Sequence, residues 1–172
     1  EMLYRLASTS WMNLIDGVRA PCAEALHEAR DDAPMLCSIH DALSWVAFYL
    51  ADLSSAAKHA RESASRVPQT PDPAARADAL ATLAFVEFLQ GRRNSDLMDR
   101  ALELQQVALE QVSWTEASVY TTPGSIHGLE LMWSGRLTEA RAILEQELAL
   151  YEQVYARLAV DVPVPDLVIY LQ

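Results

Sequence analysis

The chain has 172 residues, of which 51% are hydrophobic, so it can bury one core of ordinary size. Its formal net charge is -11 at pH 7, because 24 Asp and Glu residues outnumber 13 Lys and Arg residues. An acidic surface repels the phosphate backbone of nucleic acids, so we expect no direct nucleic-acid contact by this segment.

Cys22 and Cys37 lie in helical or apolar stretches, which is more typical of buried thiols in a cytosolic protein than of a disulfide. The sequence has no apolar run of about 18 residues, and no signal peptide is visible. We therefore expect a cytoplasmic chain with no membrane partner. It opens at Glu1 in a helical pattern and stops at Gln172 within an apolar run, so we expect it to be a fragment of a longer protein.

The first part of the chain predicts helices wherever apolar residues recur at helical spacing. Asp16-Gly17 interrupts the first helix, Pro21 and Pro34 suit the first turns of the next two, and Asp52 can cap the fourth. The expected helices cover residues 3–15, 21–31, 34–50 and 52–67.

The second part begins at the clearest loop, residues 68–73, where three prolines remove backbone donors and prevent a continuous helix. Gly91 marks a turn, and Pro123 suits the start of a later helix. No segment has the sustained alternation of a strand. The expected helices cover residues 74–90, 95–112, 123–134 and 138–158, with a truncated ninth helix over 166–172 capped by Asp166.

A repeat runs through these helices. A small or fairly small residue recurs in the first helix of each pair at Thr9, Ser44, Ala84 and Gly128, in steps of 35, 40 and 44 (44−9, 84−44, 128−84). In the second helices the steps at Leu53, Leu97 and Leu137 are 44 and 40, which indicates about four extra residues after Gly91. One hairpin cannot bury both of its faces, so hairpins of this kind stack. We expect an all-α domain of about four stacked antiparallel hairpins, at 1–32, 34–67, 73–112 and 120–159.

This pattern resembles the tetratricopeptide repeat. In that family a Gly or Asp turn follows the small residue, here at Gly17, Asp52, Gly91 and Gly135. An Ala opens the second helix, here Ala56 and Ala140, whereas Pro21 and Arg100 occupy that column in the other two repeats. Thr9 is larger than usual, and the period exceeds that of the family. The resemblance implies a right-handed α-solenoid (superhelix).

A second resemblance covers nearly the whole chain. It is carried by SWVAFYLADLSSAAKHARESA (44–64), ARADALATLAFVEFLQGR (75–92), MDRALELQ (98–105) and GLELMWSGRLTEARAILEQEL (128–148). These phrases are similar to the helical-repeat region of large LuxR-type ATPase transcriptional regulators, similar to the maltotriose-responsive activator family. The resemblance implies ATP binding and DNA binding in other parts of a parent protein. This sequence itself has no GxxxxGK[ST] motif and no basic recognition helix.

Candidate catalytic and metal sites are weak. Cys37 and His40 could share a helix face, but Cys22 and His27 do not line up with each other, so we expect no metal site. His40, Asp41 and Ser44 lie on one helix, where the Asp cannot orient the His as in a triad. The acidic residues of 138–158 fit a solvated face better than a carboxylate pair. We therefore expect neither a cofactor nor an enzyme.

The tetratricopeptide resemblance also implies an inner groove, formed by first-helix positions. Its proposed residues are Asp41, Trp45, Phe48, Tyr49, Phe85, Phe88, Leu129, Met132 and Trp133. Such an aromatic surface suits an apolar helix, a peptide, a protein or a small-molecule effector. The alternative is that these rings pack against neighbouring hairpins or against the remaining domains of the parent.

Two functions remain open. The first is a non-catalytic, effector-sensing or protein-binding repeat domain of a LuxR-family regulator of transcription. The second is a freestanding protein-protein interaction adaptor of the tetratricopeptide type. The sequences that flank the chain would separate the two.

Overall fold

The computed structural model describes residues 22, 24–111 and 122–158, and within these ranges the chain is all-α. The expected helices at 3–15 and 166–172, with most of 113–122, lie outside the described residues. Residues 24–29 are helical, and a short 3-10 helix, η1, spans Val67–Gln69. The main helices are α2 (Ala33–Tyr49), α3 (Leu53–Ala64), α4 (Pro73–Leu89), α5 (Ser95–Gln111), α6 (Pro123–Trp133) and α7 (Leu137–Leu158).

Local sequence explains where these helices begin. The carboxylate of Asp32 accepts the backbone N–H of Met35 at 3.0 Å, and that of Asp52 accepts the N–H of Ser55 at the same distance. Asp72 and Thr122 cap α4 and α6 in the same manner. Proline lies in the first turn of α2, α4 and α6, where its missing N–H has no intrahelical acceptor to lose. The predicted starts are therefore confirmed to within a residue or two.

The turns inside the three hairpins share one geometry. Ala51, Gly91 and Gly135 have φ angles of 59°, 76° and 76°, the left-handed conformation that ends many helices. The N–H of the next residue then bonds back to the helix, as Arg92 does to Glu87 O at 2.8 Å and Arg136 to Leu131 O at 2.9 Å. The repeat alignment predicted Asp52 at the turn position of the first described hairpin, and this prediction is wrong. Ala51 holds the turn, and Asp52 caps the next helix.

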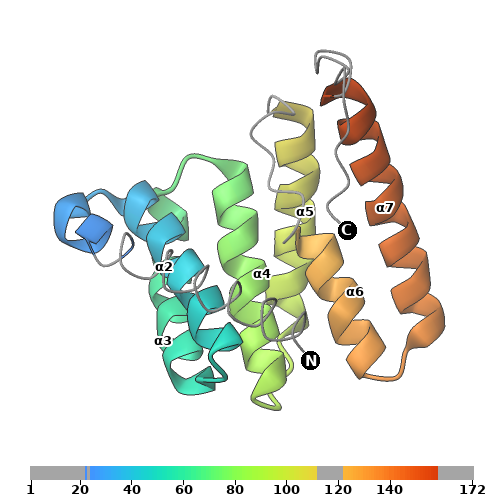
Figure 1. Ribbon diagram of the computed structural model, residues 1–172, viewed down its shortest axis with the longest axis horizontal. Helices are drawn as coiled ribbons and strands as arrows, with labels where there is room; N and C mark the ends of the chain where they lie inside the picture. Colours follow the sequence, from blue (N-terminus) through green and yellow to red (C-terminus); the bar gives the residue numbers. More distant parts are fainter. Residues whose placement is uncertain (1–21, 23, 112–121, 159–172) are drawn as a thin grey trace, which may run out of the picture.

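The hairpins α2–α3, α4–α5 and α6–α7 lie side by side (Figure 1), each made of two antiparallel helices joined by a short turn. The first helices form a continuous set, because α4 packs against both α2 and α6. Between hairpins, α3 packs on α4 and α5 packs on α6. Helix α4 is therefore central, which explains why eight of its seventeen residues are buried.

Two clusters form the core. The larger one centres on Phe85 and joins Cys37 of α2, Met98 and Ala101 of α5 and Ile126 of α6. The smaller one lies between α2, α3 and α4 and consists of Ala47, Ala56, Ala57, Ala60 and Val86. The second is built largely from alanine because close helix approach leaves little room for side chains.

The small residues of the repeat lie where two helices of one hairpin meet. Ser44 is fully buried and its hydroxyl donates to Ala56 O at 3.0 Å. Ala84 is also buried. A Cβ added to Gly128 would lie 2.6 Å from Leu144 Cδ2, too close for any real contact. The prediction of close approach is confirmed at Ser44 and at Gly128.

The repeat alignment was wrong at one column. Arg100 is exposed, whereas Ala101 is fully buried against the core, as are Ala56 and Ala140 in the other hairpins. Ala101 lies 10 residues after its turn glycine (101−91), and Ala56 lies 5 after Ala51 (56−51). In α4–α5 the buried alanine therefore lies five residues further from the turn than in α2–α3, not four as the alignment indicated. An alanine is buried at this position in each of the three described hairpins.

One helix end also differs from expectation. Helix α3 stops at Ala64, three residues before the predicted Val67, and η1 occupies the start of the expected loop. Pro68 falls in the first turn of η1, where a proline is tolerated, but it could not continue an α-helix. None of the helices in the described ranges has the length and hydropathy that a membrane crossing needs.

Candidate functional site

Four aromatic side chains connect the first helices of the three hairpins. Trp45 of α2 stacks on Phe85 of α4 with ring centroids 5.6 Å apart, and Phe85 lies 5.7 Å from Trp133 of α6. Phe48 completes the set, 5.4 Å from Phe85 in an edge arrangement. We call Trp45, Phe48, Phe85 and Trp133 the aromatic row. Aromatic pairs at these separations attract each other beyond simple burial, so the row links residues that lie far apart in the sequence.

The residues of the expected groove differ in their access to solvent. Phe85 is only 1% exposed and is a core residue, which agrees with the packing alternative for this ring. Trp45, Phe48, Phe88 and Leu129 are partly buried. Three residues remain accessible at the margins: Tyr49 is 53% exposed, Met132 39% and Trp133 51%. The row is therefore accessible at Trp133 on α6, and on α2 beside Tyr49, whose ring centroid lies 6.2 Å from that of Trp45.

Trp45 is fixed by a polar contact as well as by stacking. Its indole N–H donates to the Thr82 hydroxyl oxygen at 3.1 Å, and Thr82 is buried. Burial raises the pKa of Asp41 to about 6, while a hydrogen bond with Thr82 acts in the opposite direction. The Thr82 hydroxyl thus accepts from Trp45 and donates to Asp41. The Oδ1 atom of Asp41 is buried without a hydrogen-bond partner.

A second carboxyl lies on the neighbouring helix. Burial raises the pKa of Asp78 on α4 to about 8, and the negative charges of Asp41 and Asp72 raise it further. Asp78 therefore holds its proton at neutral pH, whereas Asp41 is largely ionised. Two neighbouring carboxyls with separated pKa values are a pattern that can also serve as acid and base.

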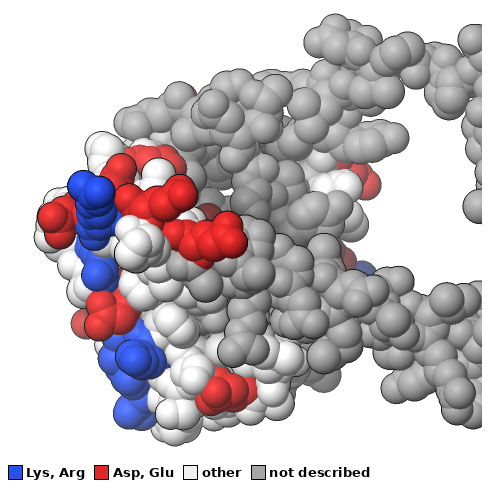
Figure 2. All heavy atoms as spheres, turned by 60° about the vertical axis from the view of Figure 1, so that its left-hand side comes forward, with Lys and Arg blue, Asp and Glu red and all other residues white. Residues whose placement is uncertain are grey.

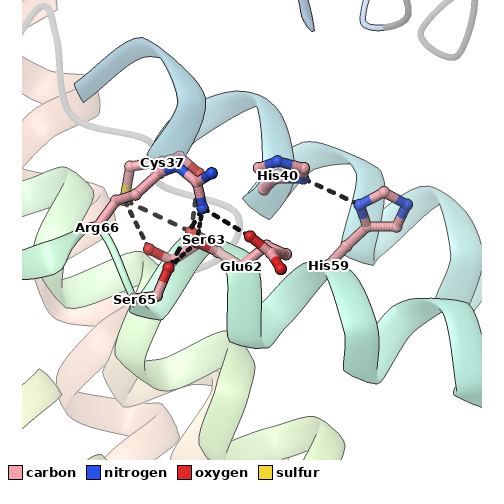
Figure 3. Close-up of polar contacts among 7 residues, drawn as sticks. All are labelled: Cys37, His40, His59, Glu62, Ser63, Ser65 and Arg66. Carbon is pink, nitrogen blue, oxygen red and sulfur yellow. Dashed lines mark hydrogen bonds and ion pairs between the residues drawn. The ribbon is translucent and has the colours of Figure 1, made fainter. Parts of the chain in front are cut away.

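His40 of α2 and His59 of α3 form a pair between the two helices (Figure 3), with their Nδ1 atoms 3.0 Å apart. One ring must donate its Nδ1–H and the other must accept, so the two histidines hold different tautomers. Burial lowers the pKa of both, and for His40 the neighbouring His59 lowers it further. The neutral pair therefore holds α2 against α3.

The other polar groups in Figure 3 have structural partners. The Ser63 hydroxyl donates to Cys37 O at 2.7 Å, and both side chains are fully buried. Arg66 pairs with Glu62 one turn earlier, with N and O atoms 2.9 Å apart. The buried thiol of Cys37 lies beside Ser63 and not beside His40, so this cluster joins α2 to α3 without the geometry of a nucleophile and its base.

The considered triad and metal site gain no support in the described ranges. Ser44 donates its hydroxyl to a backbone carbonyl, and His40 pairs with His59, so His40, Asp41 and Ser44 do not engage one another. In residues 22, 24–111 and 122–158, no group of three His, Cys, Asp or Glu side chains is placed to hold a metal ion.

The charged surface at the α2–α3 end is mixed in sign. Figure 2 brings this end forward, and Lys and Arg side chains line one edge with Asp and Glu among and beside them. Such a face lacks the continuous positive surface that follows a phosphate backbone.

No protein-family model, curated protein or solved structure matches this chain.

Sequence reasoning missed two partners near the groove. Thr82 was not singled out, although it connects Trp45 to Asp41 across two helices. His59 was treated only as one of four histidines, although it pairs with His40. The step of 37 residues from Trp45 to Thr82 lies near the repeat period, and that signal could have placed the two on adjacent first helices.

Proposed function

We propose that this chain is a non-catalytic helical-repeat domain that binds a peptide, a protein segment or a small effector along its first helices. The observation that carries the proposal is the aromatic row, because it spans three hairpins and ends in the half-exposed ring of Trp133. Rigid aromatic side chains at an accessible margin provide contact area with little loss of conformational entropy.

The same proposal includes the finer architecture. We infer that the hairpins are successive units of a tetratricopeptide-like right-handed solenoid. Three features support it: the shared turn geometry at Ala51, Gly91 and Gly135, the small residues where paired helices meet, and the contacts of α4 with both α2 and α6. In such an array each hairpin contacts only its neighbours, so a ligand that spans several first helices changes their relative packing.

The biological setting in this proposal is a LuxR-type transcriptional regulator, in which ATP binding and DNA binding belong to other domains. The domain would respond to its ligand by a shift between two packings of the solenoid, biased by whichever packing the ligand binds more tightly. A cytoplasmic location goes with that setting. The support is the resemblance of residues 44–64, 75–92, 98–105 and 128–148 to the repeat region of those regulators.

The test requires a ligand and a matched pair of variants. A random peptide library displayed on phage is selected against the whole chain, and selected peptides are titrated by calorimetry. Trp133→Ala should weaken binding by about tenfold or more, because it removes an accessible aromatic anchor. Val107→Ala, an exposed apolar residue on α5 away from the row, should leave affinity unchanged. Equal affinities of both variants for every selected peptide would reject the groove.

The parent protein is tested separately, by reading the coding sequence on both sides of this chain. A phosphate-binding loop upstream with a basic helix-turn-helix downstream supports the regulator. Stop codons immediately outside residues 1 and 172 would reject it and favour the freestanding adaptor.

A further inference from the structure

A pocket with a volume of about 130 Å³ lies between the hairpins α4–α5 and α6–α7. Its apolar part is formed by Phe88 of α4, Met98 of α5 and Leu131 of α6, and the rest of its lining is mainly charged or hydroxyl-bearing. Since a cavity of about 150 Å³ can bind benzene, this one has room for about six to eight non-hydrogen atoms. Phe88 is the one residue of the expected groove that lines it, so the pocket is separate from the aromatic row.

The turn between α4 and α5 builds one side of this pocket. Helix α3 begins two residues after Ala51 and α7 two residues after Gly135, but α5 begins four residues after Gly91 (53−51, 137−135, 95−91). The longer turn contributes Arg93 and Asn94 to the lining. The departure from the other two turns therefore places a guanidinium group beside the neighbouring hairpin.

Arg93 is held at the pocket by α6. Its Nη2 atom donates to the Ser134 hydroxyl oxygen at 3.1 Å, and that hydroxyl donates to Glu130 O at 2.7 Å. Among the described residues no carboxylate pairs with Arg93, so the other N–H groups of its guanidinium are free to bind a ligand. A guanidinium in this state can bind a carboxylate through two parallel hydrogen bonds.

Two carboxylates line the same pocket, Asp99 of α5 and Glu130 of α6. The Oε2 atom of Glu130 lies 3.7 Å from His127 Nδ1, which is longer than a hydrogen bond. Within the described part of the chain, neither carboxylate is paired with an arginine. Carboxylates in this state can accept charge-assisted hydrogen bonds from an ammonium group. The pocket thus presents a cation and two anions that do not neutralise one another.

We propose that this pocket binds a free α-amino acid with a small aliphatic side chain. The carboxylate of the ligand lies against Arg93, its ammonium group against Glu130 and Asp99, and its side chain on the apolar part of the lining. An α-amino acid carries both charges within the few atoms that the volume admits. Its binding bridges the two hairpins, and it does not depend on a ligand at the aromatic row.

A nuclear magnetic resonance titration of the whole, ¹⁵N-labelled chain tests this site. The probes are L-alanine, L-valine and L-leucine, with two analogues of valine: 3-methylbutanoate lacks the ammonium group, and isobutylamine lacks the carboxylate. At least one amino acid should shift the backbone amide signals of Asn94, Ser95 and Ser134, with a dissociation constant of about 1 mM or lower. Each analogue should bind about tenfold or more weakly than valine, because it leaves one charge of the pocket unmatched.

Arg93→Gln should weaken the binding of the amino acid by about tenfold or more, because it removes the partner of the carboxylate. The double variant Asp99→Asn with Glu130→Gln should weaken it by a similar factor from the ammonium side. Arg92→Gln is the matched control, since it removes the same charge from the adjacent, exposed residue that does not line the pocket. It should leave the affinity unchanged, and well-dispersed spectra should show that every variant is folded.

Three results would overturn the proposal. One is the absence of shifts at the pocket with all three amino acids at concentrations up to about 20 mM. Another is equal affinity for valine and either analogue, which would assign the pocket to a simple anion or to a simple cation. The third is an equal loss of affinity in Arg92→Gln and Arg93→Gln. None of these measurements involves Trp133, so failure of this site and failure of peptide binding at the aromatic row are distinguishable.

Discussion

Asp78→Asn should make the chain more stable at neutral and alkaline pH, and its benefit should grow with pH. Burial, with the charges of Asp41 and Asp72, raises the pKa of Asp78 from 3.8 to about 8. An unfolded chain has an Asp pKa of about 3.9. Between these values the folded state therefore binds more protons than the unfolded state, and stability falls as pH rises from about 4 to about 8. Asparagine has nearly the same shape and never ionises, so it removes this loss.

The magnitude follows from the size of the shift. At 1.36 kcal/mol per unit, a rise of roughly four units corresponds to an upper bound of about 5–6 kcal/mol in the free energy of unfolding. Water penetration and relaxation reduce such a value, and we expect about 2–3 kcal/mol between pH 4 and pH 8.5. Burial raises the pKa of Asp41 to about 6, against the opposing effect of the hydrogen bond with Thr82. Asp78→Asn should therefore still lose stability between pH 4 and 6, because Asp41 ionises there. Above pH 6 neither position 78 nor Asp41 should cause a further loss of stability.

The assay is urea unfolding followed by circular dichroism from pH 4 to 9, with the variant and the unmodified chain compared at each pH so that the other titrating groups cancel. Glu103→Gln removes an exposed carboxylate on α5 and serves as the control, with little expected change. A stability difference between Asp78→Asn and the unmodified chain that stays constant from pH 5 to 9 would refute the protonated Asp78.

Two further substitutions test the helix contacts. Gly128→Val should lower the free energy of unfolding by about 1–3 kcal/mol, because its side chain meets Leu144. Adding Leu144→Ala should recover part of that loss in urea unfolding, and strictly additive effects would contradict the contact. His59→Gln should reduce the destabilisation of the chain on acidification from pH 7 to 5. The lowered pKa of both paired histidines means that their stability contribution is present above about pH 6.5 and lost below it. Thermal unfolding at both pH values measures this effect, His27→Gln on the exposed surface is the control, and an equal pH response of the two variants would argue against the pair.

Local signals determined the helices and their caps. Asp52 and Thr122 accept N–H bonds from residues three positions later, and Gly91 and Gly135 adopt the left-handed turn, because these preferences act within a few residues. The fold class was predictable for the same reason. The small residues of the repeat were informative as well, since Gly128 is at the closest approach of its hairpin.

Only the tertiary structure decided which residues share an environment. Whether Arg100 or Ala101 occupies the buried position depends on the orientation of α5 against α4, because a shift of one residue turns a helix by about 100°. The burial of Phe85 depends on neighbours from α2 and α6 that lie some forty residues away on either side. The Thr82 link between Trp45 and Asp41, and the pairing of His40 with His59, likewise arise from helix–helix contacts. Helix formation is local, whereas burial and pKa values depend on which helices meet, and that is set by packing across the whole domain.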